Sequence, residues 1–219
     1  MPLVIAIIGK SDAGKTFLIT RLIPEMKKRG YSVAAIKSCP HGFDLDVEGK
    51  DSWCFTRAGA EGVLLQSPSA LGLIRARSSI ASSLNEIARH YFPDFDLVLA
   101  EGFAQDLSTR RIEVLRKGIS EQLESPPETL IAIVADFPLS PDKPTFDPDE
   151  LSGIGDFLER SIGESKEGTP LVELKQDGTP VFLNEFVQSV MKSTIAGLIA
   201  PLKKEEKEYS EIQIRIRTQ

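Results

Sequence analysis

The chain has 219 residues, a net charge of −6 and a sequence pI near 5.1, which argues against a general role on nucleic acid or on a membrane surface, because either role needs a basic face. Its hydrophobic fraction of 41% and charged fraction of 26% are ordinary for a globular protein. Two cysteines and an N-terminal apolar run too short for a signal peptide or a membrane span favour a cytoplasmic protein. The length, large for one domain and small for two, favours one main domain with an appendage.

The chain opens with a strand, a helix and a second strand. The aliphatic run Leu3 to Ile8 is typical of a strand buried on both faces. Residues 16–29 carry apolar side chains at helical spacing, and residues 31–37 form a second apolar run. This order predicts an α/β fold with a mostly parallel sheet flanked by helices.

The rest of the main domain, residues 1–162, continues this alternation. We expect a short helix over 51–60, two short strands over 62–67 and 71–76, a helix over 79–91, a buried strand over 96–102, a strand near a sheet edge over 111–116, a loop over 117–129, a last core strand over 130–136 and a closing helix over 149–161.

A polar stretch at 163–169, GESKEGT, predicts a linker to a small unit over 170–219. In that unit we expect a hairpin with Asp177-Gly178 at its turn, a helix over 184–202 and a strand over 211–217. Such a β-β-α-β unit is too small to be stable alone, so we expect it to pack on the main domain or on a partner.

The segment GKSDAGKT lies between the first strand and the first helix and fits the phosphate-loop pattern G-x-x-x-x-G-K-[ST]. Its glycines permit a tight backbone path, its lysine suits the β- and γ-phosphates, and the threonine hydroxyl suits Mg²⁺. The alternative is a glycine-bearing turn that binds nothing. The predicted phosphate-binding residues are Gly9, Lys10, Ser11, Asp12, Ala13, Gly14, Lys15 and Thr16.

Two charged side chains follow predicted strands that end at the same edge of the sheet. Glu101 ends the strand DLVLAEG, where a carboxylate holds Mg²⁺ through water or orients an attacking water, unless it is only a solvated acid. Lys37 ends the second strand and faces the same crevice, so that it and Lys50 are candidates for binding further phosphates.

The loop over 38–51 is polar and acidic. Asp44 and Asp46 are candidates for holding a metal or a nucleophilic water. Cys39 and His41 form an alternative transition-metal pair, and a flexible surface loop with cap residues is the third interpretation.

Several stretches together resemble one family. GKSDAGKT, LIPEMKKRGYSVAAIK, HGFDLDVEGKDSW with AGAEGVLLQSP, DLVLAEGF with RIEVLR, and IAIVADFPL resemble the molybdopterin-guanine dinucleotide biosynthesis adapter family MobB, over about residues 2–162. This resemblance implies a P-loop NTPase that binds GTP and Mg²⁺ and has weak GTPase activity. It also implies a homodimer that assists a MobA-type nucleotidyltransferase in joining GMP to molybdenum-bound molybdopterin.

The resemblance also implies roles for particular residues. Phe43, Asp44, Leu45 and Asp46 contribute to the nucleotide site, and the segment 73–76 approaches it. Glu101 and Asp46 are then the candidate catalytic residues, and Thr16, Asp44 and Glu101 the candidate metal ligands.

Some positions depart from the family pattern. Ser38 stands where the family often has His, and Phe17 stands where a second Thr is common, which alters contacts to the α-phosphate. No N-K-x-D guanine-recognition motif is present, and Asp136 is its best substitute, unless it serves as a plain helix or loop cap.

Other functions stay open at this point. A metal-delivery GTPase would use Cys39 and His41, although such proteins usually have more Cys and His than this chain. A small-molecule kinase would use Asp44 or Glu101 as its base, and a binding-only adapter would hydrolyse nucleotide incidentally.

Overall fold

The computed structural model describes residues 1–43, 46–75, 83–139, 142–167, 172, 174–176, 179–181, 183 and 185–200. The chain divides into two compact units, Met1–Lys166 and Glu167–Gln219. Among the described residues, no helix combines the length and apolar character that crossing a membrane would need.

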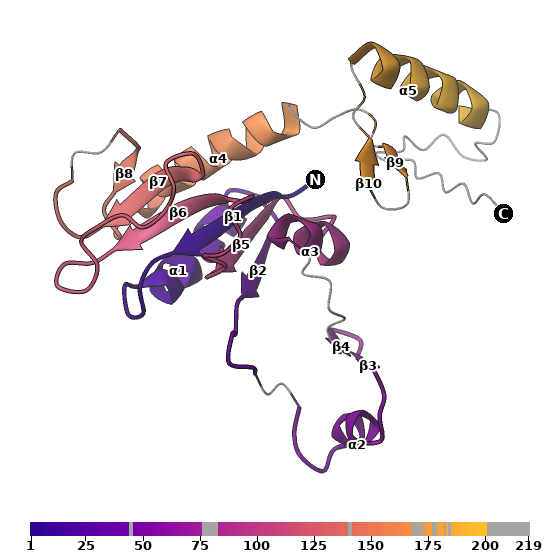
Figure 1. Cartoon of the computed structure of the whole chain (residues 1–219), viewed down its shortest axis with the longest axis horizontal. Helices are drawn as coiled ribbons and strands as arrows, with labels where there is room; N and C mark the ends of the chain where they lie inside the picture. Colours follow the sequence, from indigo (N-terminus) through magenta and orange to yellow (C-terminus); the bar gives the residue numbers. More distant parts are fainter. Residues whose placement is uncertain are drawn as a thin grey trace. The chain divides into compact units, whose positions relative to one another are not determined.

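The first unit is built on a six-stranded sheet whose neighbouring strands are all parallel, as expected for the predicted α/β fold. The order across the sheet is β2 (Val33–Lys37), β5 (Leu97–Glu101), β1 (Leu3–Ile8), β6 (Arg110–Leu115), β7 (Leu130–Ala135) and β8 (Thr145–Phe146) (Figure 1). Only β8, a two-residue strand, was not expected from the sequence.

Helices cover both faces of this sheet. On one face α1 (Lys15–Lys28) and α4 (Leu151–Glu167) pack against alternate residues of β1, such as Ile5 and Ile7. On the other face α3 (Leu84–Tyr91) packs against the residues in between, such as Ala6. The continuous apolar sequence of β1 therefore reflects burial on both faces, as predicted.

The prediction that the strand RIEVLR lies near a sheet edge is wrong, because β6 is central, between β1 and β7. Its charged residues Arg111 and Glu113 are only 2% and 1% exposed. The Arg111 guanidinium donates to the carbonyl oxygens of Ala104 and Asp106, and the Glu113 carboxylate accepts hydrogen bonds from the N–H groups of Glu124 and Ser125. The alternation thus comes from buried charged side chains that bond to the backbone of neighbouring loops.

The segment between β2 and α3 contains α2 (Asp51–Arg57) and a hairpin of β3 (Gly62–Gln66) and β4 (Leu71–Arg75), close to prediction. The two strands are antiparallel and form a sheet of their own, with Leu64 opposite Leu73. Helix α3 begins after the cap residue Ser83, and the expected start of this helix at 79 falls outside the described residues.

Helix α4 runs further than the predicted closing helix, through Glu167, so the first residues of the predicted linker at 163–169 are helical. The reason is that Ile154, Leu158 and Ile162 continue one buried stripe against the sheet, and a single Gly163 does not end a helix held by such packing.

The second unit contains the antiparallel strands β9 (Leu174–Gln176) and β10 (Thr179–Val181), followed by α5 (Glu185–Ile199). These elements agree with the predicted hairpin and helix. The predicted turn residues Asp177-Gly178 and the predicted strand over 211–217 lie outside the described residues.

Candidate nucleotide-binding site

The loop between β1 and α1 has the backbone geometry that its glycines predict. Gly9, Asp12 and Gly14 all have positive φ, at 147°, 63° and 100°. A Cβ on Gly9 would lie 2.5 Å from the carbonyl oxygen of Val114 in β6, so this position requires glycine for space as well as for conformation. The loop therefore passes close against the sheet before it enters α1.

Lys15, the first residue of α1, reaches back over this loop. Its Nζ atom donates to the carbonyl oxygens of Gly9 at 2.9 Å and Lys10 at 2.6 Å. The ammonium is held at the mouth of the loop by backbone acceptors, beside the positive end of the α1 dipole. One positive charge and a helix N-terminus therefore face the same spot, which is what a phosphate group needs.

Thr16 and Lys37 meet at the carboxylate of Glu101. The Thr16 hydroxyl donates to Oε2 of Glu101 at 2.8 Å, and Nζ of Lys37 donates to Oε1 at 2.9 Å. Glu101 and Lys37 are directly opposite each other in the parallel ladder of β2 and β5, so their side chains emerge at the same edge. Glu101 and Lys37 thus lie together at the carboxyl ends of β5 and β2, and their role toward a ligand stays a prediction.

The local charges change the acidity of Glu101. Burial alone would raise its pKa, but the hydrogen bonds from Lys37 and Thr16 and the charges of Lys37 and Lys15 lower the pKa below its ordinary value. The hydrogen bond to Glu101 raises the pKa of Lys37 in turn. Glu101, whose side chain is 16% exposed, is therefore ionised at neutral pH and available to a cation.

The opposite side of the loop contacts β6 and the segment that follows it. Nη1 of Arg116 donates to the carbonyl oxygen of Asp12 at 3.3 Å, and Nζ of Lys10 lies 3.4 Å from the Glu124 carboxylate. Neither Arg116 nor Glu124 was predicted to lie beside this loop. The available signal was that Arg116 directly follows a strand, but its place next to the loop depends on the order of the strands.

Asp136 connects the ends of two strands. It directly follows β7, and its Oδ1 accepts a hydrogen bond from the N–H of Lys117, just beyond β6, at 2.7 Å. Asp136 is exposed and follows the carboxyl end of β7, the end of the strands at which the phosphate loop also lies. Its predicted role with a purine is therefore compatible with a second, structural role as a loop cap.

The loop after β2 holds several of the other predicted residues. Phe43 is 67% exposed, and His41 is exposed as well. Oδ1 of Asp46 accepts hydrogen bonds from the Val47 N–H and from the Ser52 hydroxyl, at 2.9 and 2.7 Å. Asp44 and Leu45 lie outside the described residues, as does Ala76 at the end of the segment 73–76.

No cluster of three or more His, Cys, Asp or Glu side chains suited to a metal occurs in the described part of the chain. A magnesium ion at a phosphate loop needs a different set, namely one hydroxyl, one carboxylate, phosphate oxygens and water. In the described residues, the Thr16 hydroxyl and Oε2 of Glu101 lie 2.8 Å apart beside this loop.

Comparison with known proteins gives a consistent result. The family model described as "Molybdopterin guanine dinucleotide synthesis protein B", MobB, matches residues 4–136. The molybdopterin-guanine dinucleotide biosynthesis adapter protein of Haemophilus influenzae is 33% identical over 156 residues, covering 71% of this chain and 86% of that protein. The Escherichia coli adapter protein of the same name is 31% identical over 162 residues, covering 70% of this chain and 90% of that protein.

The fold agrees with this sequence similarity. The chain superposes on a crystal structure of molybdopterin-guanine biosynthesis protein B with a TM-score of 0.57 and a sequence identity of 32%. The match covers 74% of this chain and 99% of that chain. The crystal structure of Bacillus subtilis MobB has the same TM-score, 0.57, at 23% identity, and supports the fold alone. With a matching family model, a phosphate loop in its expected place and relatives similar over most of their length, the chain belongs to the MobB family of molybdopterin-guanine dinucleotide biosynthesis adapter proteins.

Proposed function

We propose that the first unit binds GTP with Mg²⁺, hydrolyses it slowly, and assists a MobA-type nucleotidyltransferase that joins GMP to molybdenum-bound molybdopterin. The observation that carries the nucleotide part is the contact of Thr16 with Glu101 beside the Lys15 ammonium, because it brings a hydroxyl, a carboxylate and a cation together at one phosphate loop. The adapter role follows from membership of the family.

Each of these side chains has a part in the proposed mechanism. Lys15 exchanges its carbonyl partners for oxygens of the β- and γ-phosphates. Thr16 and Glu101 would hold Mg²⁺, which would neutralise phosphate charge, and Glu101 would orient the attacking water. Lys37 keeps the Glu101 carboxylate in place through its hydrogen bond. The reaction class is hydrolysis of the terminal phosphoanhydride bond.

We expect this chain to prefer guanine to adenine nucleotides and to require Mg²⁺. The expectation comes from the family, because a purine-recognition motif is missing from the sequence. Specific binding stabilises the folded state by mass action, so GTP with Mg²⁺ should raise the melting temperature more than ATP at equal concentration. Melting temperatures measured with GTP, with ATP, and with GTP plus a chelator of Mg²⁺ test both expectations. Equal shifts with the two nucleotides would instead favour the small-molecule kinase.

We also propose that Asp46 positions metal or water. Its Oδ2 atom is buried and has no hydrogen-bond partner among the described residues, while Ser52 holds the other oxygen. Asp46→Asn should lower GTP turnover about tenfold, as expected for a positioned group, and change GTP affinity much less. Single-turnover hydrolysis at saturating Mg²⁺ measures this effect, with Asp51→Asn on the exposed start of α2 as the matched control. A rate within about twofold of the parent protein would leave Asp46 as a loop cap.

We propose further that the chain forms a homodimer through the hairpin of β3 and β4. Leu64 and Leu73 pair across this hairpin and are 55% and 43% exposed, and Leu65 and Leu71 are exposed as well. Apolar side chains gathered on so small a sheet favour a covering partner, and a second copy offers the same surface. Leu64→Glu combined with Leu73→Glu should convert a dimer into a monomer in analytical ultracentrifugation. A dimer that survives both changes would place the interface elsewhere.

A further inference from the structure

An aromatic ring lies directly beside the phosphate loop. Phe17 follows Thr16 in the first turn of α1 and is 56% exposed, whereas Leu18 and Ile19 next to it are buried in the core. Side chains of a helix point back toward its N-terminus, so this ring covers the turn nearest the loop rather than the turns that follow. Nothing in the packing of α1 on the sheet requires an aromatic residue here.

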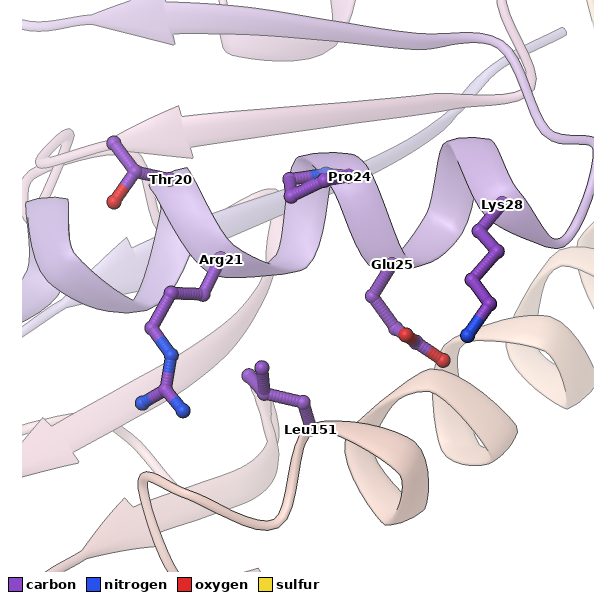
Figure 2. Close-up of a pocket in the computed structure, with 6 residues that line it drawn as sticks. All are labelled: Thr20, Arg21, Pro24, Glu25, Lys28 and Leu151. Carbon is purple, nitrogen blue, oxygen red and sulfur yellow. The ribbon is translucent and has the colours of Figure 1, made fainter.

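The ring is held in place by a cation. The Arg21 guanidinium lies over it, 4.8 Å from the ring centroid. Arg21 in turn donates to the carbonyl oxygen of Pro148 at 3.2 Å and to Oδ1 of Asp149 at 2.6 Å, just before α4 begins. Figure 2 shows the Arg21 side chain leaving α1 on the side of Leu151, the first residue of α4. Arg21 therefore has partners of its own near the start of α4, and its guanidinium lies against one face of the Phe17 ring.

These contacts also show on which side of the phosphate loop the ring lies. Thr16, Glu101 and Lys37 occupy the side of β5 and β2. Arg21 joins the segment that follows β8, at the opposite end of the strand order, so the contact of Phe17 with Arg21 lies away from β5 and β2. The metal-binding and aromatic groups thus flank the loop on different sides.

We propose that Phe17, positioned by Arg21, is the surface on which the nucleobase of the bound nucleotide stacks. This inference rests on the proposed nucleotide binding. A nucleotide whose phosphates occupy the loop must place its base a short distance beyond it, and a planar base gains from an exposed ring that is already fixed. Stacking also tolerates different bases, which fits a chain without an N-K-x-D motif. Recognition of the purine edge then falls to other groups, Asp136 among them.

The test separates the base from the phosphates. The protein, with Mg²⁺ present, is titrated by calorimetry with GTP and with inorganic tripolyphosphate, which has no base. Phe17→Ala should weaken GTP binding about tenfold, as for removal of a base–aromatic stack, and leave tripolyphosphate binding within about twofold. Phe17→Trp should keep GTP affinity. Phe55→Ala is the matched control, because Phe55 is 57% exposed in α2 and has no part in the proposal.

The other possible outcomes overturn either the stacking proposal or nucleotide binding itself. If Phe17→Ala weakens both ligands equally, the ring only shapes the phosphate loop and the stacking proposal is wrong. If GTP binds the parent protein no more tightly than tripolyphosphate, or if Phe17→Ala leaves GTP affinity unchanged, the proposal is likewise overturned while nucleotide binding stands. If the parent protein binds neither ligand, nucleotide binding itself fails. Circular dichroism spectra of all three variants exclude misfolding as the cause.

Discussion

Lys15→Ala should weaken GTP binding by at least about thirtyfold while the fold stays intact, since losing one partner of a buried charge-assisted contact costs about 2–5 kcal/mol. Among the described residues, the Lys15 ammonium bonds only to the carbonyl oxygens of Gly9 and Lys10, so its removal leaves the core untouched. Its contribution appears when phosphate arrives. Calorimetric titration with Mg²⁺ and GTP measures the change, and the melting temperature reports on the fold.

The control for this variant removes the same charge from the other end of the same helix. Lys27 is exposed in the last turn of α1, about 18 Å along the helix axis from Lys15. Lys27→Ala should therefore leave GTP affinity within about twofold. If Lys15→Ala binds GTP as tightly as the parent protein does, the loop does not hold phosphate and the proposed function is wrong.

Glu101→Gln should lower GTP turnover about a hundredfold, within the range seen when a positioned acid or base is lost. Glutamine keeps the shape of the side chain and an acceptor for Thr16, but it removes the negative charge that Mg²⁺ and the attacking water need. GTP affinity should fall less, because the phosphate loop supplies most contacts. Single-turnover hydrolysis across a range of Mg²⁺ concentrations measures both effects. Turnover at the parent rate would remove Glu101 from the catalytic centre.

The same variant has a readout that needs no nucleotide. Because the folded protein lowers the pKa of Glu101 below its ordinary value of 4.5, the ionised carboxylate stabilises the fold above that pH. This stabilisation is lost as the pH falls below 4.5 and through the lowered pKa. Urea unfolding should therefore show the parent protein more stable than Glu101→Gln at pH 7, with the difference shrinking in acid. A difference that does not change with pH would contradict the lowered pKa.

The phosphate loop could be predicted because its chemistry is local. Gly9, Gly14, Lys15 and Thr16 lie within eight consecutive residues between a strand and a helix, and that order alone places them together. Glu101 and Lys37 were also predictable, because each ends an apolar strand, and parallel strands end at one edge. These inferences need only the class of the sheet and not the order of its strands.

The other contacts depend on that order. Arg116 reaches Asp12 only because β6 lies directly beside β1, and the alternation in RIEVLR pointed to an edge instead. A charged residue in a strand usually indicates exposure to solvent. Nothing in the local sequence shows that backbone groups of two loops will bond to Arg111 and Glu113. The cation contact between Arg21 and Phe17 was missed for a related reason, since Arg21 is fixed by residues that come 127 and 128 positions later.

The buried charges of β6 also bear on how much the site must rearrange. Glu113 holds the backbone at 124 and 125, Glu124 pairs with Lys10, and Arg116 bonds to Asp12, so one side of the phosphate loop is attached to the most central part of the sheet. The conformational entropy of that side is lost once, when the chain folds, and is not lost again when a ligand arrives. Preorganisation of this kind lowers the entropic cost of binding a ligand at this loop.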